Sequence, residues 1–122
     1  MNKPNGSGLS RIAKAGICSL QGLKAVYKNE AAFRQELLGF VIFAPLAFWL
    51  GDTPLGISLM LAALVLVLLV EVLNSAIEAI VDRIGLEQHE LSGRAKDMGS
   101  LAVTLAIIIG GIVWVGVILG NY

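Results

Sequence analysis

Five polar side chains recur along one apolar stretch of the chain, and their types suit metal binding or proton transfer. They are Glu71, Asn74, Ser75, Glu78 and Asp82. At about 100° per residue of an α-helix, all five fall on one stripe, opposite an apolar face. The stretch continues a run apolar enough to enter a bilayer, where carboxylates are costly unless they meet partners, ions or substrate. The spacing therefore predicts a functional site on one helix face.

Four kinds of site fit this stripe. The first is a polar seam between packed helices, and the second is a pathway for protons or cations. The third is a divalent metal site, because Mg²⁺ is typically held by one or two carboxylates together with substrate phosphates. The fourth adds a general base, since a carboxylate beside apolar surface can accept a proton from a hydroxyl. Spacing alone leaves all four open.

The composition indicates what kind of molecule must position these groups. Mean hydropathy is +0.81, and 57% of the 122 residues are hydrophobic while 15% are charged, which is typical of membrane proteins. A chain of this length has room for one domain with a few spans, and not for a separate nucleotide-binding module. Its single cysteine excludes an internal disulfide and a cysteine zinc cluster. No cleavable signal peptide is expected.

The pattern predicts an all-α membrane protein. We expect a flexible N-terminus over residues 1–8, an amphipathic surface helix over 9–29 and a three-span membrane domain over 30–122. The spans are expected at about 31–50, 55–83 and 95–119. A tight turn is expected at residues 51–54, a helix stop at Gly85, a polar loop over 86–93 and an N-cap at Ser92.

Basic residues predict the orientation of the spans. All nine lie before the first span, at its start, or between the second and third spans, and the first connection and the C-terminal tail have none. The positive-inside rule then places the N-terminus and the second loop in the cytoplasm and the C-terminus on the opposite side. The nine residues are Lys3, Arg11, Lys14, Lys24, Lys28, Arg34, Arg83, Arg94 and Lys96.

Other residues are expected near the acidic stripe. Glu30, at the start of the first span, could meet Glu78 at the same membrane depth. Lys96 and Asp97 stand at the entry to the third span, where a lysine can neutralise a phosphate. His89 is the chain's single histidine and is expected to cap a helix or face solvent rather than bind a metal. No Walker-type or Gly-x-Gly-x-x-Gly phosphate loop is present.

Three segments together resemble a known family. Residues 29–36, 71–83 and 89–100 look like the prokaryotic integral-membrane diacylglycerol kinases, particularly the Gram-negative form, and the similarity extends from about Arg11 to Ser100 in order and spacing. The resemblance implies a multi-pass homotrimer of the bacterial inner membrane with composite sites. It also implies phosphoryl transfer from MgATP to the hydroxyl of diacylglycerol, which gives phosphatidate in phospholipid recycling.

The resemblance also implies roles for individual residues. Glu71 would be the catalytic base, supported by Asn74, and Glu30 and Glu78 would hold Mg²⁺. Lys96 would be a further catalytic residue, on the nucleotide side. Asp82 is expected to have a structural role at the helix exit. The nucleotide side would comprise Arg11, Cys18, Glu30, Glu78, Glu87, Gln88, His89, Lys96 and Asp97, and the lipid side Arg11, Ser19, Ala31, Arg34, Glu36, Glu71 and Ser100.

Departures and rival interpretations accompany this resemblance. Similar proteins often carry aromatic residues where this chain has Cys18 and Leu20, which removes the expectation of a stacking contact with nucleotide there.

An undecaprenol kinase is the close alternative, because a polyprenol also presents one hydroxyl at the interface. A small proton-coupled transporter also uses a membrane-embedded Glu, but usually has four spans and little Lys/Arg bias. A noncatalytic assembly subunit would leave the stripe as an interhelical seam.

Overall fold

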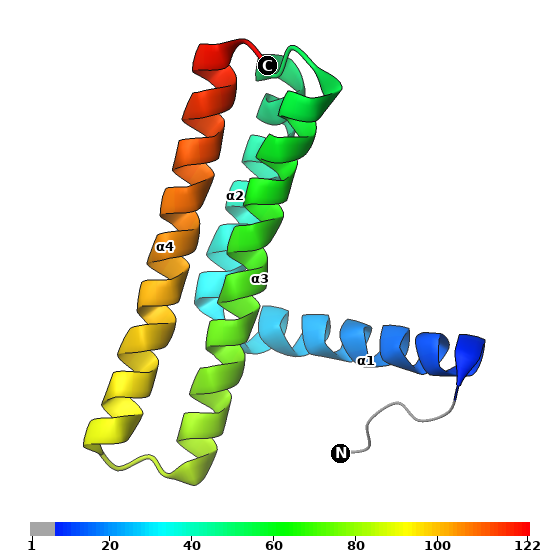
Figure 1. The fold of residues 1–122 in the computed structure, drawn as a ribbon. Helices are drawn as coiled ribbons and strands as arrows, with labels where there is room; N and C mark the ends of the chain where they lie inside the picture. Colours follow the sequence, from blue (N-terminus) through cyan, green and yellow to red (C-terminus); the bar gives the residue numbers. More distant parts are fainter. Residues whose placement is uncertain (1–6) are drawn as a thin grey trace. The chain divides into compact units, whose positions relative to one another are not determined.

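The computed structural model describes residues 7–122, which form four helices (Figure 1). These are α1 (Gly8–Asn29), α2 (Ala31–Leu50), α3 (Pro54–Ile84) and α4 (Glu90–Gly120). The all-helical expectation is confirmed. Most of the expected flexible N-terminus, including Lys3, lies outside the described residues, and Gly8 already belongs to α1.

The described residues divide into two units, one ending at Ala31 and the other comprising residues 32–122. Within the first unit, Val26 is the buried residue of α1. The apolar side chains of Ile12, Leu20 and Leu23 along the same helix are more than half exposed, at 67%, 61% and 51%. A helix with so much exposed apolar surface needs another surface to cover it.

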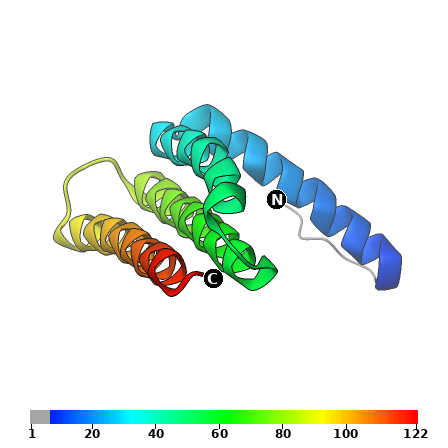
Figure 2. The same cartoon turned by 90° about the horizontal axis from the view of Figure 1, so that it is seen from above.

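In the second unit, α3 and α4 lie side by side and antiparallel, with α2 alongside (Figures 1 and 2). Ala47, Met60 and Val117 form a buried cluster that takes one residue from each of the three helices. Trp114 of α4 donates its indole N–H to the backbone carbonyl of Met60 at 3.2 Å, and its ring meets that of Phe43 edge-on at 5.7 Å between centroids. The hydrogen bond to Met60 helps to set the register of α4 against α3, and the ring contact joins α4 to α2.

The turn between α2 and α3 has the expected chemistry. Thr53 has extended backbone and caps α3 by accepting a hydrogen bond from the backbone N–H of Gly56 at 3.0 Å. Pro54 follows in the first helical turn, where its missing N–H costs nothing. The predicted turn over residues 51–54 is therefore confirmed.

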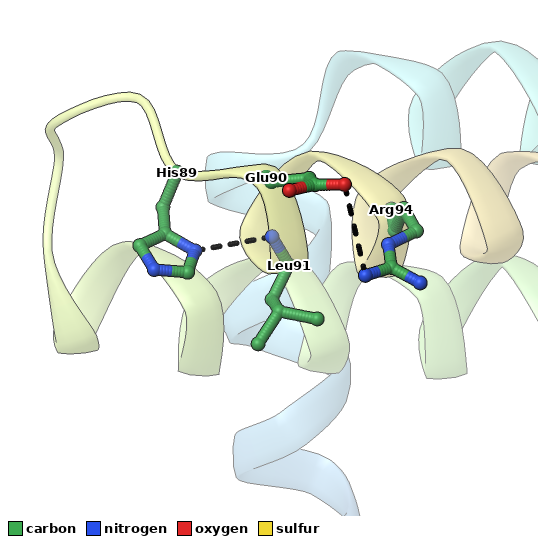
Figure 3. Close-up of polar contacts among 4 residues, drawn as sticks. All are labelled: His89, Glu90, Leu91 and Arg94. Atoms are coloured by element: carbon green, nitrogen blue, oxygen red, sulfur yellow. Dashed lines mark hydrogen bonds and ion pairs between the residues drawn. The ribbon is translucent and has the colours of Figure 1, made fainter.

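The connection between α3 and α4 corrects two expectations. α3 ends as predicted at Gly85, whose N–H bonds to the carbonyl of Val81 at 3.2 Å. The expected N-cap at Ser92 is wrong, because His89 caps α4 and Ser92 lies within the helix. The imidazole Nδ1 of His89 accepts the backbone N–H of Leu91 at 3.0 Å, as Figure 3 shows. The expected loop over residues 86–93 is therefore shorter and ends at His89.

Helices α2, α3 and α4 are each long and apolar enough to cross a membrane. α3 and α4 each contain 31 residues. At about 1.5 Å per residue they exceed a hydrocarbon core of about 30 Å, so part of each helix extends beyond the core. The acidic stripe occupies the end of α3 nearest the α3–α4 loop.

Candidate functional site

The acidic stripe lies on the continuous helix α3 and becomes more exposed toward the loop. Glu71 is buried, with 4% of its surface exposed, and is the only buried polar or charged residue among those described. Asn74, Ser75 and Glu78 are half-buried, while Asp82 is exposed. Helical periodicity places these residues on one face, and their exposure follows their position along α3, because Asp82 lies within the last turn before the loop. The stripe therefore joins a buried carboxylate to a solvent-exposed one.

Asn74 connects the stripe to α4. Its amide nitrogen donates to Oε1 of Glu78 at 3.3 Å. Its Oδ1 is buried and lies so close to Gly99 that a β-carbon added at that glycine would overlap it. Gly99 is itself buried on α4. The absence of a side chain at Gly99 therefore lets Asn74 reach α4 while it orients the Glu78 carboxylate.

Asp82 and Lys96 form an ion pair between α3 and α4. The Lys96 Nζ lies 2.8 Å from Oδ1 of Asp82, and the two side chains are 45% and 48% exposed. Glu78 lies within electrostatic range of the same ammonium. This pair was not predicted from the sequence. Opposite charges a few residues to either side of a short helix–helix loop could have indicated it. Lys96 is thus held at the exposed end of the stripe.

A polar pocket of about 620 Å³ lies at the α3–α4 loop. Its lining includes four of the predicted nucleotide-side residues, namely Glu87, Gln88, His89 and Lys96. Asp82 and Glu90 also line it, and Glu90 pairs with Arg94 one turn along α4 at 3.9 Å (Figure 3). The predicted residue Asp97 is exposed but does not line this pocket. The pocket thus combines several carboxylates with one ammonium, a charge distribution that suits an anion bound as a complex with a cation.

A second, apolar groove of about 380 Å³ lies between α2, α3 and α4. Phe43, Ala63 and Trp114 are among its lining residues, and Glu36 contributes a carboxylate. Glu36 is the only residue of the predicted lipid side that lines the groove. Arg34 and Ser100 are exposed on α2 and α4, and Glu71 is buried on α3. The four predicted lipid-side residues that belong to this unit are therefore distributed over its three helices.

The predicted metal pair spans the two units. Arg11, Cys18, Ser19, Glu30 and Ala31 belong to the first unit, whereas Glu78 belongs to the second. The pairing of Glu30 with Glu78 stays a prediction. Over residues 7–122, no group of three or more His, Cys, Asp or Glu side chains is gathered to hold a metal ion. A Mg²⁺ ion bound here would need phosphate, water or a neighbouring protomer to complete its ligands.

Fold and site together define a small membrane protein with three apolar helices and an acidic site at one end of a helix pair. The chain matches the family model of prokaryotic diacylglycerol kinases over residues 17–118, and it belongs to that family. The family expected from the sequence is thus confirmed. The match also removes the transporter interpretation.

Individual relatives agree along nearly their whole lengths. The chain is 52% identical to a diacylglycerol kinase of Haemophilus influenzae over 112 residues, which cover 92% of this chain and 95% of that protein. It is 53% identical to one of Escherichia coli over 110 residues, 90% of each chain. A third, from Pseudomonas aeruginosa, is 47% identical over 114 residues, 93% of each chain.

Proposed function

We propose that this protein is a lipid kinase that transfers the γ-phosphate of ATP to the free hydroxyl of diacylglycerol, giving phosphatidate and ADP. Membership in the diacylglycerol kinase family, with relatives about half identical over nine-tenths of the chain, carries the proposal. The geometry supports it, because α3 joins a buried carboxylate to a polar pocket. A lipid hydroxyl at the membrane interface needs a site close to apolar surface, and a soluble nucleotide needs a polar site beside it.

In this proposal Glu71 takes the proton from the lipid hydroxyl while the hydroxyl oxygen forms a bond to the γ-phosphorus of ATP. The bond between that phosphorus and the bridging oxygen breaks, and ADP leaves with the electron pair. Phosphoryl transfer depends mainly on positioning and charge neutralisation, and little on covalent chemistry by the protein. Asn74 orients Glu78 through its 3.3 Å hydrogen bond, and Lys96 brings positive charge toward the nucleotide phosphates.

The donor set fits Mg²⁺. Glu78 is a half-buried carboxylate beside an amide donor, and Mg²⁺ prefers carboxylate oxygens combined with phosphates. Glu78 and Glu30 are the side chains that would hold it. When bound, Mg²⁺ would neutralise charge on the phosphate oxygens. The carboxylates around the polar pocket support nucleotide binding as a complex with a cation, because a bare polyphosphate would be repelled.

A phosphorylation assay tests the function directly. Purified full-length protein is given MgATP with diacylglycerol and undecaprenol in parallel, and phosphate transfer to each lipid is measured. We expect transfer to diacylglycerol at a much higher rate. Transfer to undecaprenol alone would replace the proposed acceptor, and transfer to neither would overturn the lipid kinase proposal.

The proposal includes the placement of the chain in the bacterial inner membrane. The bias of basic residues supports a cytoplasmic N-terminus and α3–α4 loop, with α1 lying along the membrane surface. Cys18 is the chain's only cysteine and is partly exposed on α1. A membrane-impermeant thiol reagent should therefore label inverted inner-membrane vesicles and spare right-side-out ones. The reverse labelling pattern would contradict this orientation.

A further inference from the structure

The Asp82–Lys96 ion pair is a contact that the chemistry above does not use. Its partners come from α3 and α4, and both line the 620 Å³ polar pocket. Both side chains are about half exposed, and ion pairs between solvent-exposed groups contribute little to stability. Fold stability alone is therefore a poor explanation for a 2.8 Å contact at the edge of this pocket.

Lysine chemistry suggests what the contact does. A lysine side chain is flexible and carries three N–H donors on its ammonium. One donor can hold Asp82 while the others face an anion in the pocket. A carboxylate at 2.8 Å restricts the orientations that the ammonium would otherwise sample, so less conformational entropy is lost when an anion binds.

We propose that Asp82 is a positioning residue that holds the Lys96 ammonium at the pocket wall, ready for the phosphates of MgATP. The proposal rests on the lipid kinase function argued above. Asp82 acts only through Lys96, because its own negative charge would repel a phosphate. Lys96 in turn neutralises an acid that would otherwise oppose nucleotide binding. The pair therefore predicts that the loss of MgATP affinity caused by removing the Asp82 carboxylate disappears or reverses when Lys96 is absent.

Steady-state kinetics of the full-length protein in lipid micelles test this idea. Asp82→Asn should raise the KM for MgATP roughly three- to tenfold and change kcat less, because it weakens nucleotide binding. Asp82→Glu, which keeps the carboxylate, should recover most of the loss. Asp52→Asn is the control, since it removes one negative charge from an exposed acid in the α2–α3 connection, outside the pocket, and leaves the partner of Lys96 intact. It should not raise the KM.

The double variant separates positioning from a general structural role. In a Lys96→Met background, Asp82→Asn should leave the affinity for MgATP unchanged or improve it, because an unpaired acid is removed from the pocket. MgATP affinity is measured by equilibrium dialysis as well, so that the result does not depend on lipid turnover, and thermal unfolding confirms folding. The inference is overturned if Asp82→Asn behaves like Asp52→Asn, or if it weakens binding equally in both backgrounds. If the wild type binds MgATP but phosphorylates no lipid, the kinase proposal fails by itself.

Discussion

Glu71 is a carboxylate kept inside an otherwise apolar part of the molecule. With 4% of its surface exposed, it bears the cost of leaving water, and a neutral or apolar side chain would avoid that cost. Its neighbours along the stripe are progressively more exposed. A base that meets a lipid hydroxyl must lie near the apolar side of the site, whereas groups that meet a nucleotide must lie near water. The stripe has that order.

Glu71→Gln should abolish nearly all turnover while MgATP binding persists. Glutamine keeps the size of the side chain and its hydrogen-bonding capacity but cannot accept the hydroxyl proton, and loss of a general base costs about 10² to 10⁴ in rate. A lipid phosphorylation assay would check the loss of turnover, and equilibrium dialysis of MgATP on the same preparation would check that binding persists. Near-normal turnover would remove Glu71 as the base.

Glu78→Gln should raise the magnesium concentration needed for half-maximal activity. A neutral amide is a weaker Mg²⁺ ligand than a carboxylate, and the exchange leaves the contact with Asn74 possible because the amide oxygen can still accept. Activity is measured across a magnesium titration at fixed ATP, with Asp52→Asn, a substitution in the α2–α3 connection, as a control for net charge. An unchanged magnesium response would argue against Glu78 as a ligand.

Residue positions along one helix were predictable, but contacts between helices were not. The stripe from Glu71 to Asp82 follows from the helical period. The Asp82–Lys96 pair depends on how α4 is registered against α3, and Trp114 and Met60 help to set that register through a contact distant in sequence. At the start of α4 the sequence offered two capping residues. The imidazole of His89, expected to cap a helix or face solvent, takes the role, and Ser92, the residue type preferred at N-caps, does not.

At the scale of elements, the α3–α4 pair holds the site together. Its contacts near the site are the Asp82–Lys96 pair and the approach of Asn74 to Gly99. The first is exposed, whereas the second lies where Gly99 is buried. A substitution that adds atoms at a buried close contact is tolerated less well than one at an exposed ion pair, because no empty space surrounds the buried contact. The geometry of Asn74 and Glu78 therefore depends on a glycine that carries no chemistry itself.

Gly99→Ala should lower both stability and turnover. The new methyl group would overlap Oδ1 of Asn74, and such overpacking typically costs about 1–3 kcal/mol. Gly116→Ala is the matched control on the same helix, because nothing lies within 4 Å of its added β-carbon. Thermal unfolding and kcat are measured for both variants. Equal unfolding temperatures and equal turnover would show that Asn74 is not constrained by Gly99.

At the scale of the whole molecule, one protomer leaves much apolar surface uncovered. Along α4, exposed apolar side chains recur at alternating four- and three-residue intervals, a spacing typical of a seam between helices. They are Leu101, Leu105, Ile108, Ile112, Val115 and Leu119, each at least half exposed. A neighbouring protomer, as in the homotrimer that the resemblance implies, or membrane lipid would cover this surface. Each protomer has a single acidic stripe, on α3, which gives a second reason to expect sites shared between neighbours.

Mixing Glu30→Gln and Glu71→Gln chains, at a magnesium concentration too low to support the Glu30→Gln variant, tests whether sites are shared. If Glu30 of one protomer completes the site that holds Glu71 of its neighbour, Glu30→Gln and Glu71→Gln chains assembled together will form some sites with both native residues. For random equal mixing in a cyclic trimer, about a quarter of the sites should be intact. The variants are unfolded, mixed, refolded into lipid and assayed, with each variant refolded alone as the control. Sites contained within one protomer would give no recovery, because every chain then carries a defect in its own site.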